Sequence, residues 1–144
     1  MKKSIFITLS FLFITLSSQA QFTFGAGASY ITSSNTDFIG VQAKAYYGVN
    51  ETWDVSPAFT YWVGDGLDWS IDADLHYKLL TIGESFDFNP FGGLTFLNGG
   101  STELALNIGG SFKFALDSGS VIYVEPKFII IDNDSFVVSA GYLF

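Results

Sequence analysis

The sequence contains no cysteine, few charged residues and, after its first twenty residues, no long apolar run. The absence of cysteine excludes a disulfide framework, a thiolate metal site and a lipidated N-terminal cysteine. A membrane helix needs about 18 or more consecutive apolar residues, so the later part of the chain contains none. Only 6 basic residues stand against 14 acidic ones, and the formal net charge of −8 disfavours binding to nucleic acid phosphates.

Aromatic and apolar residues are what the chain has in abundance. Aromatic residues make up 18% of the 144 residues, whereas charged residues make up 14%. Low charge combined with high aromatic content argues against disorder. The length allows one domain.

The N-terminal segment has the three parts of a secretory signal peptide. Lys2 and Lys3 give a positive start, a short apolar stretch follows, and a Ser-Gln-Ala sequence ending at Ala20 provides a small-x-small cleavage site. A membrane anchor is the alternative, but the apolar run is too short for one. The sequence therefore predicts a signal peptide over residues 1–20 and one mature domain over residues 21–144.

Residues 67–78 show the pattern that recurs through the mature chain. Their sequence, LDWSIDADLHYK, alternates strictly, so that every second residue is apolar and almost all of the others are ionisable. A two-residue period is the period of a β-strand and not of a helix. About ten such residues are also what a tilted strand needs to cross a bilayer.

Eight stretches of this kind predict an all-β fold. They cover residues 22–31, 39–49, 53–63, 67–78, 86–97, 103–114, 122–131 and 136–144. Short polar or glycine-containing segments separate them, and residues 79–85 are interpreted as a plain connection. Pro57 cannot donate a hydrogen bond to a neighbouring strand, so we expect a bulge or another irregularity there.

The apolar faces of these strands are expected to point outward. They carry no charged residue and no Ser, Thr, Asn or Gln, and they hold too many aromatic rings to fit inside an eight-stranded barrel. The opposite faces are rich in Gly, Ala and Ser, as a narrow interior requires. Because hydrocarbon offers no partner to an unpaired backbone group, the last strand should pair with the first. The prediction is an eight-stranded antiparallel up-and-down transmembrane β-barrel.

The chain resembles the small eight-stranded outer-membrane β-barrels, the OmpX-like and OmpA-transmembrane-domain-like family. The resemblance rests on four segments: NPFGGLTF (89–96), LNIGGSFKF (106–114), YVEPKF (123–128) and the terminal Tyr-Leu-Phe. It implies that Tyr142 and Phe144 form a signal read by the barrel-assembly machinery, and that both termini are periplasmic. Members of that family often carry long extracellular loops that bind partners, whereas every predicted connection here is short.

Charged residues on the inward faces suggest a network that fills the lumen. Its predicted members are Lys44, Asp72, Asp74, His76, Lys113, Glu125 and Lys127. Buried charges must be paired, so salt bridges are the first interpretation, with Lys113 and Glu125 expected as diagonal neighbours. An ion path along an acid-rich lumen is the alternative. A metal or acid–base site at His76 is disfavoured, since a lone histidine among charges is more often a network member, and no serine suited to lipid-modifying chemistry stands beside it in the sequence.

A second inward set is apolar and lies toward the predicted extracellular mouth. It consists of Trp62, Leu97, Ile129, Ile131 and Val137. These side chains could cap the lumen against water or form a small apolar ligand pocket. Together the patterns predict a non-enzymatic, monomeric integral protein of a Gram-negative outer membrane, with lipid as its surroundings and no cofactor, metal or nucleic acid. A narrow channel for small or apolar solutes is the alternative, and a lipid-modifying enzyme is a distant one.

Overall fold

The computed structural model describes residues 22–34, 36–132 and 134–144, so the predicted signal peptide lies outside the described residues. All regular secondary structure in this part of the chain is β-strand. The strands are β1 (Phe22–Thr32), β2 (Asp37–Gly48), β3 (Trp53–Val63), β4 (Trp69–Tyr77), β5 (Leu80–Ile82), β6 (Phe86–Asn98), β7 (Thr102–Ala115), β8 (Val121–Ile130) and β9 (Ser135–Leu143). Within the described residues no helix is long and apolar enough to cross a membrane.

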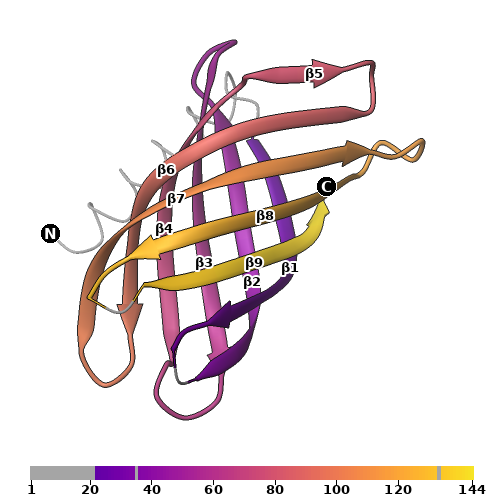
Figure 1. The fold of residues 1–144 in the computed structure, drawn as a ribbon. Coiled ribbons are helices and arrows are strands. Elements are labelled where there is room, and N and C mark those ends of the chain that lie inside the picture. Colours follow the sequence, from indigo (N-terminus) through magenta and orange to yellow (C-terminus); the bar gives the residue numbers. More distant parts are fainter. Residues whose placement is uncertain (1–21, 35, 133) are drawn as a thin grey trace, which may run out of the picture.

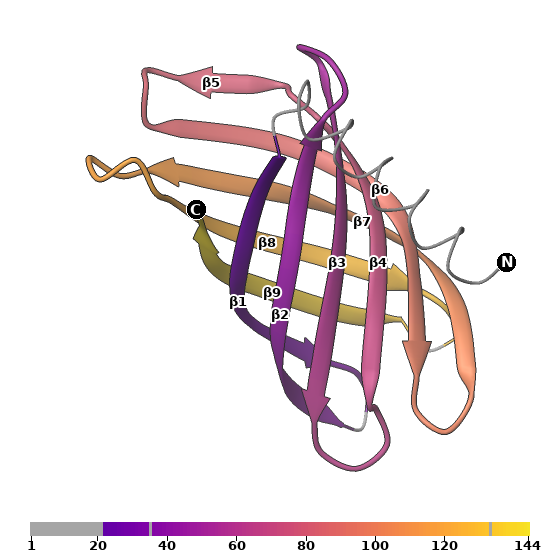
Figure 2. The same ribbon diagram turned by 180° about the vertical axis from the view of Figure 1, so that it is seen from behind.

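The strands form one closed antiparallel sheet (Figures 1 and 2). The first strand, β1, pairs with the last strand, β9, from Gly25 opposite Leu143 to Thr32 opposite Phe136, and β4 pairs with β6. The predicted closure and fold class are therefore confirmed. We call the end that holds the start of β1 and the end of β9 the terminal end of the barrel, and the opposite end the distal end.

The interpretation of residues 79–85 as a plain connection is wrong for their middle part, which forms β5. His76 of β4 lies opposite Phe91 of β6, and Leu80 of β5 lies opposite Phe88, so one extra residue stands on the β4–β5 side. An insertion of this kind is a bulge that bends the strand. β5 thus continues β4 past a bend, and the barrel keeps eight strands around its circumference.

Burial alternates along the strands in the sense opposite to that of a soluble protein. On β3, Thr60 is 1% exposed and faces the lumen, whereas its neighbour Phe59 is 45% exposed on the outside. On β4, Asp72 and Asp74 are buried and Ile71 is exposed. A polar interior and an apolar exterior are typical of barrels surrounded by lipid, and the predicted orientation of the two faces is confirmed.

Aromatic rings gather at the ends of the outer surface. Trp53 and Tyr77 lie 5.0 Å apart at the terminal end, between ring centroids, and Phe128 and Phe136 lie 5.0 Å apart toward the distal end. Rings at these levels match the two aromatic girdles that flank the apolar band of membrane barrels.

The irregularity expected at Pro57 is present, but it is not a bulge. Pairing between β2 and β3 runs as far as Lys44 opposite Ala58 and resumes with Tyr47 opposite Val55. The register is the same on both sides of the gap, so no residue is inserted. The missing N–H of the proline interrupts the ladder without shifting it.

A tyrosine lies along the wall of the lumen, over a pair of glycines at the β1–β9 seam. Gly27 and Gly141 lie opposite each other, and the fully buried Tyr123 of β8 reaches toward them. A Cβ atom would stand 2.6 Å from the Tyr123 hydroxyl oxygen if added at Gly27, and 2.8 Å if added at Gly141. The nearest atoms to either added Cβ are backbone carbonyl oxygens, of Ala140 and Ala26, so the two glycines allow the close approach of β1 and β9 as well as leaving room for this ring.

Candidate functional site

A buried ion pair spans the middle of the lumen. The ammonium of Lys44 on β2 meets the carboxylate of Glu125 on β8, and the two side chains are 2% and 5% exposed. The Tyr46 hydroxyl also donates to Glu125, and the Ser111 hydroxyl lies 2.8 Å from it. A buried carboxylate is stable only when paired and hydrogen-bonded, and Glu125 meets both conditions.

A second ion pair lies between β8 and β4. Lys127 Nζ stands 2.6 Å from Asp72 Oδ1, and both side chains are almost fully buried. Thr95 Oγ1 donates to the same carboxylate oxygen at 2.6 Å, and Asn107 Nδ2 donates to Thr95 Oγ1 at 2.7 Å. The pair therefore belongs to a chain of bonds that joins four strands.

Lys113 and Glu125 are diagonal neighbours across the β7–β8 pair, as predicted, but the expectation that they form an ion pair is wrong among the described residues. Lys113 lies opposite Tyr123 on β8, and its ammonium stands 3.7 Å from the centroid of the Tyr46 ring. Glu125 instead meets Lys44 from the facing wall. The lumen is narrow enough for a lysine to reach across it, and such cross-lumen contacts cannot be read from strand pairing in the sequence.

Hydrogen bonds between uncharged side chains link further strands inside the lumen. Gln42 Nε2 donates to Thr60 Oγ1 at 3.3 Å and to Ser139 Oγ at 3.4 Å, and Gln42 Oε1 accepts from the Tyr123 hydroxyl at 3.1 Å. The hydroxyls of Ser29 and Ser139 are 2.7 Å apart. Together with the ion pairs, these hydrogen bonds connect side chains from all eight strands around the lumen.

Asp74 and His76 are buried on β4 without complete hydrogen bonding. The fully buried His76 ring stacks on Phe91 at 4.6 Å and meets the Tyr46 ring edge-on at 5.1 Å. One Asp74 oxygen, both His76 ring nitrogens and the Ser56 hydroxyl have no hydrogen-bond partner among the described residues. Ser56 lies opposite Asp74, so a serine does stand near the histidine, and sequence analysis missed it because the two lie on different strands.

Ser56 and His76 are not arranged as a hydrogen-bonded nucleophile and base among the described residues. No hydrogen bond joins Ser56 to His76 among the described residues, and both side chains are enclosed. A nucleophile needs a base within hydrogen-bond reach and a path for substrate. In the described part of the chain, no group of three His, Cys, Asp or Glu residues is placed to hold a metal ion.

The inward apolar residues form a layer at the distal end. Ile31, Trp62, Ala105, Ile129 and Val137 are buried together, with Phe38, Leu67, Leu97 and Ile131 packed against them. The structure thus brings together the five residues that the sequence analysis assigned to the mouth. Trp62 also donates from Nε1 to Ser70 Oγ at 3.0 Å, which satisfies its polar atom below the layer.

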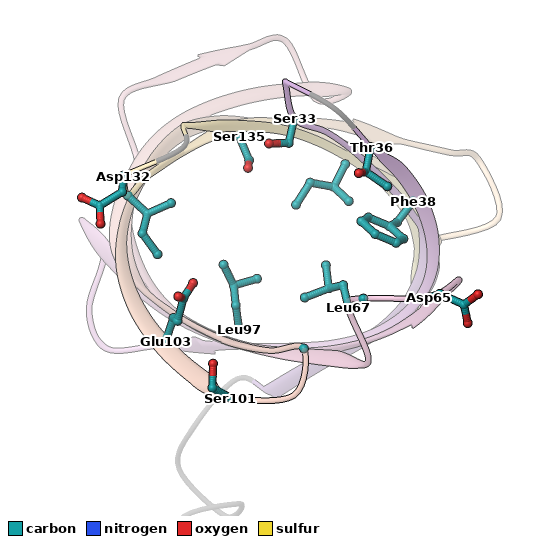
Figure 3. Close-up of a pocket in the computed structure, with 14 residues that line it drawn as sticks. Ser33, Thr36, Phe38, Asp65, Leu67, Leu97, Ser101, Glu103, Asp132 and Ser135 are labelled. Atoms are coloured by element: carbon teal, nitrogen blue, oxygen red, sulfur yellow. The ribbon is translucent and has the colours of Figure 1, made fainter.

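A cavity of about 470 Å³ opens above this layer, and we call it the distal cavity (Figure 3). Leu97 and Ile131 line it, whereas Trp62, Ile129 and Val137 lie beneath it. Its wall consists of Ile31, Ser33, Thr36, Phe38, Asp65, Gly66, Leu67, Leu97, Gly99, Ser101, Glu103, Ile131, Asp132 and Ser135. A cavity with an apolar base and a polar wall has the character of a ligand site.

The terminal end has a smaller cavity of about 230 Å³ with a different wall. Tyr46, Tyr123 and Leu143 pack together as a buried layer, and Tyr46 and Leu143 of this layer line the cavity. Lys78 Nζ pairs with Asp54 Oδ1 at 3.1 Å at its edge. The two cavities share no lining residue, and the buried polar layer stands between them.

The predicted assembly residues lie at the seam. Tyr142 and Phe144 are both exposed on the outside of the barrel. The backbone N–H of Phe144 donates to the carbonyl of Phe24 at 2.8 Å, which extends the β1–β9 pairing by one bond beyond β9.

Comparison with solved structures places the fold. The chain is similar to Ail, the attachment invasion locus protein of Yersinia pestis (TM-score 0.53, 18% identity, covering 87% of this chain and 97% of Ail). It is also similar to the N-terminal β-barrel domain of Pseudomonas aeruginosa OprF (TM-score 0.60, 15% identity, covering 88% of this chain and 100% of that domain). Neisserial surface protein A is similar as well (TM-score 0.57, 18% identity, covering 85% of this chain and 95% of that protein). Another structure shows Ail in complex with the heparin analogue sucrose octasulfate.

These likenesses show the fold alone. A de novo designed transmembrane β-barrel matches with a TM-score of 0.60 at 8% identity, so the architecture does not imply a shared activity. No protein-family model matches the sequence. The search of curated proteins finds no match either. The chain thus has the fold of the small eight-stranded transmembrane barrels.

Proposed function

We propose that this protein is a non-enzymatic, integral outer-membrane barrel whose lumen is closed by its own side chains, with both termini in the periplasm. One observation carries the proposal: two buried ion pairs and an apolar layer occupy the interior of a barrel whose outer surface is apolar. The role that follows is structural, within the cell envelope.

Membrane residence is supported by the chemistry of the outer surface. Residues such as Val41, Leu106 and Ile108 are more than half exposed. An apolar band around the whole barrel would drive aggregation in water, whereas lipid stabilises it. The fold shared with outer-membrane proteins makes the outer membrane the location we favour.

The proposal that the barrel is not an enzyme is supported by the enclosure of its single histidine and of the two carboxylates held in the buried ion pairs. His76, Glu125 and Asp72 are all at least 95% buried and lie between the two cavities. A substrate in either cavity would not meet these groups. An Ail-like interaction with a polyanion is also not proposed, because no lysine or arginine lines the distal cavity.

We expect no stable conductance step when the refolded protein is added to planar bilayers. An eight-stranded interior has room for little more than its side chains, and the paired charges hold those side chains across the lumen. Single-channel recording at both voltage polarities, with a porin in the same lipid as positive control, measures this.

A discrete, cation-selective step from the wild-type barrel would overturn the closed-lumen proposal and favour the channel alternative. The double variant Lys44→Ala with Glu125→Ala removes the cross-lumen pair and is the matched comparison. We expect this variant to leak if the pair is part of the barrier.

Deleting Phe144 is expected to reduce insertion into the outer membrane of cells sharply, while refolding into lipid vesicles in vitro is much less affected. The deletion removes one backbone bond at the seam and the aromatic residue that the proposed assembly signal requires. Heat-dependent gel mobility measures folding in both settings, and Phe144→Tyr, which keeps the ring, is the control. Equal losses in cells and in vesicles would mean that Phe144 contributes only to barrel stability.

A further inference from the structure

The distal cavity combines an apolar base with acidic residues and has no basic residue in its wall. Phe38, Leu67 and Leu97 point into it, and the Glu103 side chain rises beside Leu97, its partner across the β6–β7 pair (Figure 3). Its volume of about 470 Å³ falls within the range of small-molecule sites, roughly 300–1,000 Å³. The cavity is thus large enough for a compact organic molecule.

The charge around this cavity has one sign. Asp65, Glu103 and Asp132 border it, and none of them forms an ion pair among the described residues. The Glu103 side chain rises beside the cavity, whereas the carboxylates of Asp65 and Asp132 point outward from its rim (Figure 3). The sequence contains no arginine. Lys44 and Lys127 are held in the buried ion pairs, and the other two mature lysines line the terminal cavity.

We propose that the distal cavity binds a small organic cation, in which an ammonium group is attached to a compact apolar body. The apolar body would lie against Leu67, Leu97 and Phe38, which removes its surface from water. The ammonium would lie toward the Glu103 carboxylate, within the negative field of the rim. A neutral ligand would gain only the first interaction, and an anion would meet only like charges.

This inference goes beyond the proposed structural function and is independent of conduction, because the apolar layer separates the cavity from the ion pairs. Trp62, Ile129 and Val137 form a floor that keeps the ligand at the surface. Binding therefore requires no opening of the barrel, and a small rigid ligand can enter and leave directly from solvent.

Three probes of nearly the same shape test the proposal: phenethylammonium, 2-phenylethanol and 3-phenylpropanoate. The full mature chain is refolded into nanodiscs of zwitterionic lipid, and chemical shifts of the Leu97 and Ile131 methyl groups are followed during titration. Empty nanodiscs correct for partition of each probe into lipid. We expect saturable shifts with the cation, a weaker response with the alcohol and the weakest with the carboxylate.

Two variants and one control separate charge from apolar contact. Glu103→Gln should weaken phenethylammonium binding about three- to fivefold, the effect expected for one solvent-exposed charge, and leave 2-phenylethanol binding unchanged. Leu67→Ser lies in a connecting segment outside the strands and should weaken both probes. Because Leu67 also packs against the apolar layer, heat-dependent gel mobility first checks that this variant folds. Glu84→Gln removes an acidic residue at the terminal cavity and should change neither.

The proposal is overturned if the methyl shifts do not saturate with phenethylammonium, if the three probes bind equally, or if Glu103→Gln leaves the preference for the cation intact. Added salt should weaken the cation response and spare the alcohol response. A preference for 3-phenylpropanoate would also overturn it.

Discussion

Ile71→Lys is expected to destabilise the folded barrel by about 2–4 kcal/mol, the cost of a lysine inside the lipid-facing band. Ile71 is exposed on β4, and it lies opposite Phe59 of β3 and Phe96 of β6. All three side chains contact the surroundings of the barrel, so a lysine there would place its charge in hydrocarbon. The free energy of unfolding, from urea titration in lipid vesicles, measures the effect.

A lysine placed closer to the membrane interface provides the matched control for Ile71→Lys. Ile39 lies on the same outer surface but near the distal end of β2, and it is 62% exposed. Because the penalty for a lysine falls to about 0–1 kcal/mol near the interface, Ile39→Lys should fold almost as well as the wild type. If Ile71→Lys and Ile39→Lys were equally stable, the outer surface would not be the lipid-facing one.

Lys44→Met should cost about 3–5 kcal/mol of folding free energy, the range for removing one partner of a buried ion pair. Methionine fills much of the same space, so the loss reports the charge that remains on Glu125. Tyr46 and Ser111 would still donate to Glu125, but neither supplies a positive charge. Urea titration and heat-dependent gel mobility measure the loss.

Two further variants test whether the loss from Lys44→Met comes from the unpaired Glu125 charge. Lys44→Met with Glu125→Gln removes both charges and should cost less than the single change. Lys113→Met removes a lysine that contacts the Tyr46 ring and forms no ion pair in the described part of the chain, so its cost should be about 0.5–2 kcal/mol, that of a cation–π contact. A larger loss of stability from Lys113→Met than from Lys44→Met would contradict the pairing of Glu125 with Lys44.

The sequence was sufficient to predict the fold because the pattern that specifies it is local. Alternation assigns each residue of β4 to a face without knowledge of its neighbours, and the requirement that lipid-exposed edges be paired then closes the barrel. The bend before β5 was not predictable in this way. Leu79, Leu80 and Ile82 are all exposed, so this stretch shows no alternation to reveal a strand.

The interior was predicted as a set of residues but not as a set of contacts. Inward position is a property of one strand, whereas the Lys44–Glu125 pair depends on the distance across the barrel. Residues that share only the lumen leave no spacing in the sequence that would reveal their contact. Ser56 was missed for another reason: it lies diagonal to His76 on the neighbouring strand β3, so finding it requires the β3–β4 register.

The bend that produces β5 also bears on the depth at which the barrel sits in a bilayer. β5 pairs with β6 on one side, and on its other side no strand of the described chain pairs with it. Hydrocarbon cannot satisfy those unpaired backbone groups, whereas the headgroup layer can. With Leu80 and Ile82 exposed beside them, this segment is suited to the boundary between acyl chains and headgroups. β5 would then set the depth of the barrel in the bilayer, because moving it into the hydrocarbon would bury its unpaired backbone groups.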